Sequence, residues 1–174
     1  MGFVACNTQV IGLLREALVA QGRAALGRLP AAERGTSVLI NNLAILLQDM
    51  GKLEEARPLF EEALQACRET LGDRHQMTLV FICNLADLLR ATGALVEAEA
   101  VLGNAVTVAQ EVFGINHART LKITTIAARL QHAQPGGAAA GKELLAATVA
   151  RMAEVLGENH HQTSKYRKVL EEME

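Results

Sequence analysis

The stretch that decides the fold is TSVLINNLAILLQDMGKLEEA (36–56), because its pattern returns 42 residues later as TLVFICNLADLLRATGALVEA (78–98). The two copies share an Asn-Leu-Ala step, a single glycine and a closing Glu-Ala at matching places. A third copy begins at Thr120, a further 42 residues along the chain. Self-similarity at a fixed period is the signature of a repeat architecture, so we expect this chain to stack similar units.

Each copy is expected to form two helices. Apolar residues recur at helical spacing in its first half; in the first copy they are Ile40, Leu43, Ala44 and Leu47. Gly51 should end this helix, because glycine tolerates the left-handed backbone found at helix ends. A second helix is predicted over 53–71, with Gly72 after its end. Pro58 lies inside this second helix and fits only near its start, since proline cannot donate a backbone hydrogen bond.

The composition limits the fold and the function classes. Half of the 174 residues are apolar, 21% are charged and only 3% are aromatic, so a core can be built from Leu, Ala, Val and Ile. The formal charge of −2 argues against a nucleic-acid-binding protein, which needs a basic surface. No apolar run approaches the ~20 residues that a membrane-spanning helix requires. The composition favours an all-α protein that binds neither nucleic acid nor membrane.

Cysteine usage suggests an intracellular protein. Cys6, Cys67 and Cys83 form no Cys-x-x-Cys pair and are odd in number, so we interpret them as reduced thiols and expect a cytoplasmic location. The first 34 residues carry four arginines and few acids. They are therefore interpreted as a capping segment, with a cleaved organelle-targeting segment as the alternative.

The Gly turn followed by L-x-E-A (53–56) and L-F-x-x-A (59–63) resembles a tetratricopeptide repeat. The 42-residue period, N-N-L-A (41–44), E-A-R-P-L (55–59) and the L-G-x-x-H loop (71–75) resemble the kinesin-light-chain subtype of that family. HEAT-type repeats have a similar period, but a small alanine soon after the Gly turn in both copies favours the tetratricopeptide interpretation. The resemblance covers roughly residues 36–164 and is weakest in the third copy.

The resemblance implies an all-α, right-handed α-solenoid of about three tetratricopeptide helix pairs with N- and C-terminal capping helices. Its expected segments are an N-terminal half-repeat or cap over 1–34, three repeats within 35–160 (about 35–72, 73–114 and 115–157) and a C-terminal capping helix over 161–174. In the third copy Gln131 is polar where its counterparts are leucine, and QPGGAAAG (134–141) replaces the orderly turn. We therefore expect a looser interface in that copy.

In this family the first helix of each pair lines a concave surface, and the resemblance implies that asparagines there bind extended peptide ligands. A primary amide both donates and accepts, so it can satisfy a peptide group without demanding a particular side chain. The predicted partner-binding groove consists of Asn41, Asn42, Ile45, Gln48, Cys83, Asn84, Asp87, Arg90, Lys122 and Arg129. Alternatively, Asn42 and Asn84 make structural hydrogen bonds between neighbouring repeats.

The charge of this predicted surface changes along the chain. It runs from Asp49, through Asp87 with Arg90, to Lys122 and Arg129. One hypothesis is that a partner segment with acidic residues at one end lies along it. The alternative is that these charges only solvate a helix face.

The sequence shows no pattern that indicates catalysis, a cofactor or a metal. His75, His117 and His160 recur with the repeat, but successive loops should lie ~8–10 Å apart, whereas zinc needs its ligands about 2 Å from one ion. We therefore expect loop or helix-capping roles for them. Cys83 is expected to face the groove, but the repeat implies no neighbouring base that would activate it as a nucleophile.

The predicted function is therefore that of a non-catalytic adaptor that holds a peptide or helix of a partner protein along its concave groove. One alternative is a structural module that self-associates through a terminal repeat edge. Another is a small regulatory or assembly-factor subunit, which depends on the nature of residues 1–34.

Overall fold

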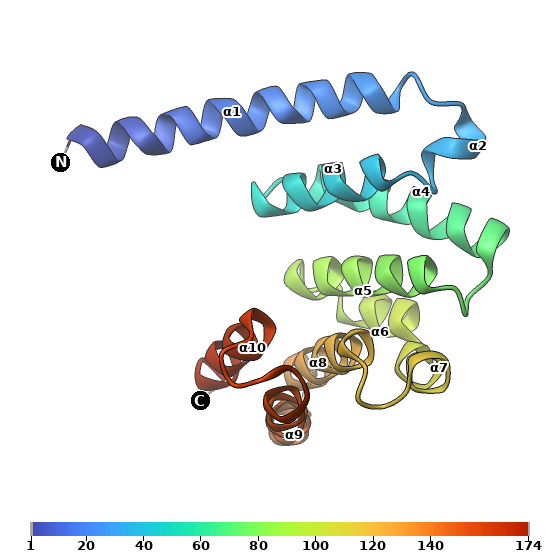
Figure 1. Ribbon diagram of the computed structural model, residues 1–174, viewed down its shortest axis with the longest axis vertical. Coiled ribbons are helices and arrows are strands. Elements are labelled where there is room, and N and C mark those ends of the chain that lie inside the picture. The colour runs from blue at the N-terminus through green and yellow to red at the C-terminus, as the bar shows by residue number, and fades with distance from the viewer. Residues whose placement is uncertain (1, 174) are drawn as a thin grey trace. The chain divides into compact units, whose positions relative to one another are not determined.

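The computed structural model describes the backbone of residues 2–173 and the side chains of residues 11–30 and 33–173. Throughout these residues the chain forms helices and turns and no strand, so the predicted all-α helical repeat fold is confirmed (Figure 1). The chain divides into two compact units, Met1–Phe81 and Ile82–Glu174, and each is described by itself. None of the helices in the described part of the chain combines the length and hydropathy needed to cross a bilayer.

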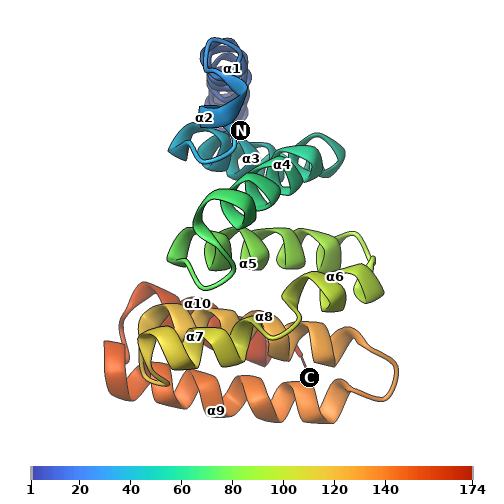
Figure 2. The same cartoon turned by 90° about the vertical axis from the view of Figure 1, so that its right-hand side faces the viewer.

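The first unit holds the N-terminal segment and the first helix pair. Its helices are α1 (Gly2–Leu26), α2 (Ala31–Arg34), α3 (Val38–Asp49), α4 (Leu53–Leu71) and the beginning of α5 (Gln76–Ala91). The second unit holds the rest of α5, followed by α6 (Leu95–Leu102), α7 (Ala105–Phe113), α8 (Ala118–Ala133), α9 (Ala138–Leu156) and α10 (His161–Glu171) (Figure 2). We call α3, α5 and α8 the A helices; α4, α6 with α7, and α9 are the B helices.

The first helix pair forms as its sequence predicts. Ser37 caps α3 by accepting a hydrogen bond from the backbone N–H of Ile40 at 3.4 Å. The predicted apolar stripe of α3 is buried; its residues are Ile40, Leu43, Ala44 and Leu47. Gly51 and Gly72 adopt φ values of 74° and 81°, the left-handed conformation that ends a helix. Pro58 is the sixth residue of α4, near its start, as expected.

Helix α1 packs on α3 over only part of its length. Val19 and Leu26 are buried, and a Cβ at Gly22 would lie 3.2 Å from Leu43 Cδ1. Glu16 forms an ion pair with Lys52, just beyond the end of α3, at 2.8 Å. The N-terminal half of α1 therefore extends past α3 (Figure 1).

The second copy departs from the expected pair of continuous helices, because its B helix is broken into α6 and α7. Gly103 adopts φ 43° and ψ −122° between them, and its N–H donates to the Glu99 carbonyl at 2.8 Å. Glycine reaches this backbone region at low cost, which is why the helix breaks at this residue. Both fragments contact α8.

The looser interface expected in the third copy was a wrong prediction. Residues 138–141, which the sequence had assigned to the replaced turn, are the first turn of α9. Gly141 lies so close to α8 that a Cβ there would be 2.3 Å from the backbone nitrogen of His132. The absence of a side chain at this position lets α8 and α9 approach closely.

The C-terminal helix α10 closes the second unit. Tyr166 is buried in a cluster shared with α8 and α9, and Leu170 and Met173 pack against that cluster from the side. Tyr166 and Leu170 thus form the apolar side expected of a capping helix.

Candidate protein-binding surface

Each A helix keeps a set of repeat-equivalent positions open or partly open to solvent while most neighbouring positions are buried; the exception is Ile126 in α8, the equivalent of Asn42 and Asn84, which is buried. We call these positions, defined by the repeat register, the open stripe. It comprises Val38, Asn42, Ile45 and Asp49 in α3, Val80, Asn84 and Asp87 in α5, and Lys122 and Arg129 in α8. The α3 members are exposed, whereas the α5 and α8 members are half-buried. Spacings of three, four and seven residues place the members of each helix on one face.

Most predicted groove residues lie on this stripe or beside it. Asn42, Ile45, Asn84, Asp87, Lys122 and Arg129 belong to the stripe, and Asn41, Gln48 and Arg90 are half-buried residues next to it. Asn41 and Asn84 each already have an interaction partner in the structure. Asn42 is the more exposed amide, so it is the asparagine best placed to meet a ligand.

Cys83 was expected to face the groove, but its burial contradicts this expectation. Its side chain is buried, with 3% of the residue exposed, so it does not line an open surface. Burial raises the pKa of the Cys83 thiol to about 12; nearby Lys122 opposes this rise and Asp87 adds to it. Cys83 also lies within electrostatic range of Tyr166. Helices that come later in the chain therefore surround this thiol, which periodicity within α5 alone could not reveal.

The repeat position of Cys83 recurs in α8 as Thr125, which is also buried. The hydroxyl of Tyr166 is hydrogen-bonded to Thr125, although burial dominates and raises the pKa of Tyr166. Tyr166 belongs to α10, so the C-terminal helix covers this row of α8. Positions 83 and 125 thus serve packing between helices rather than ligand contact.

Asp87 is the centre of a charged cluster on the open stripe. Its Oδ1 atom accepts from Arg90 Nε at 3.1 Å and from Arg129 Nη1 at 3.0 Å. The three side chains are between 18% and 29% exposed. One carboxylate between two guanidinium groups leaves a net charge of +1, and Arg129 is already engaged. The predicted basic end of the surface is therefore less basic than its sequence indicates.

The recurring histidines cap helices, as predicted. His117 Nδ1 accepts from the backbone N–H of Arg119 at 3.2 Å, and His160 Nδ1 accepts from Gln162 N–H at 3.3 Å. His75 makes the same contact with the N–H of Met77 at 3.2 Å. Each histidine satisfies one of the unpaired N–H groups at the start of a helix. Among the described residues, no group of three or more His, Cys, Asp or Glu side chains could hold a metal ion.

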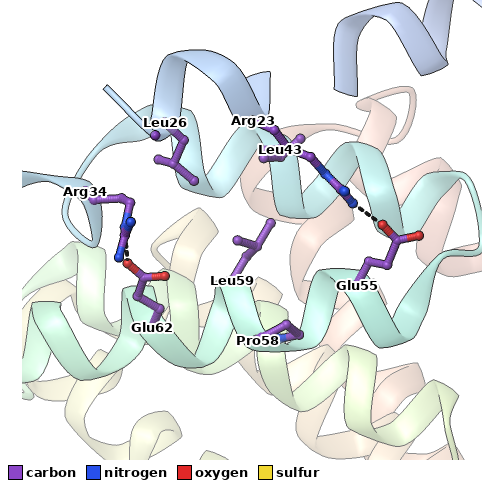
Figure 3. Close-up of a pocket in the computed structure, with 9 residues that line it drawn as sticks. Arg23, Leu26, Arg34, Leu43, Glu55, Pro58, Leu59 and Glu62 are labelled. Atoms are coloured by element: carbon purple, nitrogen blue, oxygen red, sulfur yellow. Dashed lines mark hydrogen bonds and ion pairs between the residues drawn. The ribbon is translucent and has the colours of Figure 1, made fainter. Parts of the chain in front are cut away.

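A separate pocket of about 500 Å³ lies in the first unit between the N-terminal segment and α4 (Figure 3). Leu26, Leu43 and Leu59 line it, and ion pairs between Arg23 and Glu55 and between Arg34 and Glu62 flank it. The Arg34–Glu62 pair measures 2.6 Å. No predicted groove residue lines this pocket, so it is a feature of how α1 and α2 dock on the first helix pair.

Comparison with known proteins agrees with the repeat described above. Residues 36–102 match the family model of the tetratricopeptide repeat. The matched segment contains α3, α4, α5 and α6, that is, the first helix pair and most of the second. No curated protein matched this chain. The family match supports a tetratricopeptide repeat protein, a class whose repeats generally mediate protein–protein interactions.

Proposed function

We propose that this tetratricopeptide repeat protein is a non-catalytic adaptor that holds a segment of another protein on the open stripe of its A helices. The family generally mediates protein–protein interactions, and residues 36–102 match it. The observation that supports the stripe is its register: equivalent positions of α3, α5 and α8 keep access to solvent while most of their neighbours are buried, with Ile126 of α8 as the buried exception. A face that core packing leaves open in α3 and partly open in α5 is the face available to a partner.

The chemistry of the stripe suits a peptide segment. The Asn42 amide can donate to one peptide group and accept from another. Val38 and Ile45, one turn before and one turn after Asn42, are exposed apolar side chains. We infer that α3 contacts a peptide backbone through Asn42 and apolar partner side chains through Val38 and Ile45.

The charge of the partner follows from the Asp87 cluster. Because Arg129 is paired with Asp87 at 3.0 Å, Lys122 is the cation of the predicted set that we assign to an acidic partner residue. The proposed partner segment therefore carries an acidic residue at the end that meets Lys122.

The proposal is tested by identifying partners and then measuring their affinity. Proximity labelling in cells with the wild type and Asn42→Ala should give a set of proteins that the variant loses. Isothermal titration with a confirmed partner segment should then show about tenfold weaker binding for Asn42→Ala combined with Ile45→Glu. Asn104→Ala is the matched control, since Asn104 is exposed and makes no side-chain cap bond.

Two results would overturn parts of this proposal. Unchanged affinity in the Asn42/Ile45 variant would remove the α3 stripe as the binding surface. Unchanged affinity in Lys122→Glu, compared with Lys168→Glu on α10 as control, would remove the acidic partner residue.

Self-association through the C-terminal edge is a weaker candidate. By the repeat register, Arg167 and Glu171 of α10 occupy the positions of Ile40 and Ala44 in α3. A helix that carries two charges there is poorly suited to receive another B helix, because burying charged side chains against an apolar face is costly. Light scattering over a concentration series should therefore show a molecular mass that does not increase with protein concentration.

We also propose a subtype and a cellular location for this protein. The 42-residue period supports the kinesin-light-chain-like subtype, and the lack of a Cys-x-x-Cys pair supports a reducing, cytoplasmic setting. Mass spectrometry of the N-terminus from cells tests the location. A cleaved segment within residues 1–34 would favour the organelle-targeted alternative.

A further inference from the structure

The face with which α1 docks on the first helix pair is only partly apolar. Within residues 11–26 the buried side chains are Val19 and Leu26. Glu16 and Arg23 continue the same spacing of three and four residues, so they lie on the same face of α1. This face therefore alternates charged and apolar residues, whereas the buried stripe of α3 is apolar throughout.

The two charged residues of this face form ion pairs with the beginning of α4. Lys52 Nζ donates to the Glu16 carboxylate at 2.8 Å, and Arg23 pairs with Glu55. Lys52 directly precedes α4 and Glu55 lies in its first turn, so both pairs join α1 to the same end of that helix. The four side chains are between 33% and 54% exposed. Exposed ion pairs of this kind are individually weak, and salt screens them.

Apolar packing beneath α1 is incomplete. The pocket of about 500 Å³ lies beside the Arg23–Glu55 pair, and Leu26, Leu43 and Leu59 line it (Figure 3). A well-packed protein interior leaves few voids larger than a water molecule, whose share of liquid volume is about 30 Å³. Contact between α1 and the first helix pair therefore leaves much of the adjoining apolar surface unfilled, and the ion pairs carry a large part of the attachment.

Helix α2, which follows α1, is attached differently. Gly35 at its end is buried, and a Cβ there would overlap the Ala66 side chain of α4, so the two helices are in close contact. Arg34 also pairs with Glu62 at 2.6 Å. Between α1 and this attachment, residues 27–30 form turns and no helix. A movement of α1 can therefore be absorbed by residues 27–30 while α2 stays in place.

We propose that α1 is a detachable arm that swings away from α3 and α4 about residues 27–30, and that the Glu16–Lys52 and Arg23–Glu55 ion pairs hold it closed. Opening takes α1 away from Leu43 and makes the pocket accessible on that side. Ionic conditions thereby control access to this part of the first helix pair. The arm is independent of the open stripe, because none of the four charged residues belongs to that stripe.

Double electron–electron resonance between spin labels at Gly12→Cys in α1 and Glu54→Cys in α4 measures the position of the arm. A Cβ at position 12 meets nothing within 4 Å, and Glu54 is exposed. A Cys6→Ser background, in which burial protects Cys67 and Cys83, confines the labels to these sites. Dilution with unlabelled chain removes distances between molecules.

The salt dependence of this distance is the first readout. Raising NaCl from about 0.01 M to about 1 M shortens the Debye length from ~30 Å to ~3 Å. Because both ion pairs are screened, the ratio of the long-distance to the short-distance population should increase about tenfold.

Charge reversal is the second readout. Arg23→Glu should increase the open population about tenfold at low salt, because Glu55 then faces a like charge. Adding Glu55→Arg restores the opposite charges and should restore the closed distance, a recovery that a folding defect would not show. Arg68→Glu is the matched control. Arg68 pairs with Asp73 beyond the other end of α4, at 3.0 Å, so this reversal should leave the distance unchanged.

Three outcomes contradict the proposal. The first is a single short distance at both salt concentrations. The second is a failure of Glu55→Arg to close the arm in the Arg23→Glu variant. The third is equal opening in Arg68→Glu, which would show that any loss of charge pairing along α4 releases α1.

Discussion

Asp87 and Arg129 stand one repeat length of 42 residues apart and are joined by an ion pair of 3.0 Å between Oδ1 and Nη1. They occupy the same position in successive A helices, α5 and α8. The pair therefore ties one copy to the next within the second unit. Since the stability of a repeat protein depends largely on contacts between neighbouring copies, a link of this kind contributes directly to the interface.

The first prediction concerns this ion pair. A double-mutant cycle with Asp87→Ala and Arg129→Ala should give a coupling free energy of about 0.5–1 kcal/mol in urea unfolding. The magnitude is modest because both side chains keep some contact with water. The control cycle uses Arg57 and Glu61, a pair within α4 at 2.7 Å, and should give about 0.3–0.5 kcal/mol. Strictly additive effects at positions 87 and 129 would contradict the interpretation of this pair as a link between copies.

The second prediction concerns the close approach at Gly141. Gly141→Ala should lower the free energy of unfolding by about 1–3 kcal/mol, because the new Cβ would meet the α8 backbone and force the helices apart. Gly12→Ala in α1 is the matched control. A Cβ there meets nothing within 4 Å, so the substitution should stabilise by about 0.5–1 kcal/mol through helix propensity. Thermal unfolding of both variants distinguishes them, and a neutral Gly141→Ala would show that the interface can relax.

The third prediction concerns the histidine caps. His117→Ala should destabilise the protein by about 0.5–2 kcal/mol, since the N–H of Arg119 loses its acceptor. His117→Asn should recover part of this loss, because asparagine can also cap. It should not recover all of it, because the imidazole ring also stacks on Phe113 with 5.0 Å between ring centroids. Chemical denaturation gives the ranking, and equal stability of the two variants would argue against a capping role.

The fourth prediction concerns the buried thiol at position 83. An alkylating reagent attacks the thiolate, and the pKa of Cys83 is raised from 9.0 to about 12 by burial. At pH 8 its thiolate fraction should therefore be about a thousandfold lower than that of an ordinary cysteine. In a Cys6→Ser background, alkylation of Cys83 in the folded protein should be correspondingly slow, and unfolding by urea should remove this protection. Mass spectrometry of the labelled peptides gives the rate for each thiol, and rapid labelling of folded Cys83 would mean that this face opens in solution.

Much of the helical organisation could be predicted from the sequence because it depends on local patterns. Gly51 and Gly72 mark real helix ends, and both adopt the positive φ that their positions require. The recurrence of His75, His117 and His160 in the loops before α5, α8 and α10 predicted loop or capping roles for them. These features involve a few neighbouring residues, so periodicity and residue type are sufficient to find them.

The errors arose where packing between helices decides the outcome. Cys83 lies on the edge of the A-helix face, and the Lys122 and Tyr166 side chains that surround it come from helices much later in the chain. Gly141 belongs to a segment rich in glycine and alanine, which alone cannot distinguish a loop from a helix that needs close approach. The Asp87–Arg129 pair could have been predicted from the sequence, because the two residues carry opposite charges at the same repeat position. Repeat proteins allow this comparison because equivalent positions of adjacent copies lie near one another.

The break at Gly103 has a consequence for how the second copy acquires its structure. Helices of eight and nine residues, such as α6 and α7, are too short to persist alone in water. Both rest on α8, which belongs to the third copy. We therefore expect the second B segment to become ordered only after α8 has formed, so that folding here runs against the direction of synthesis.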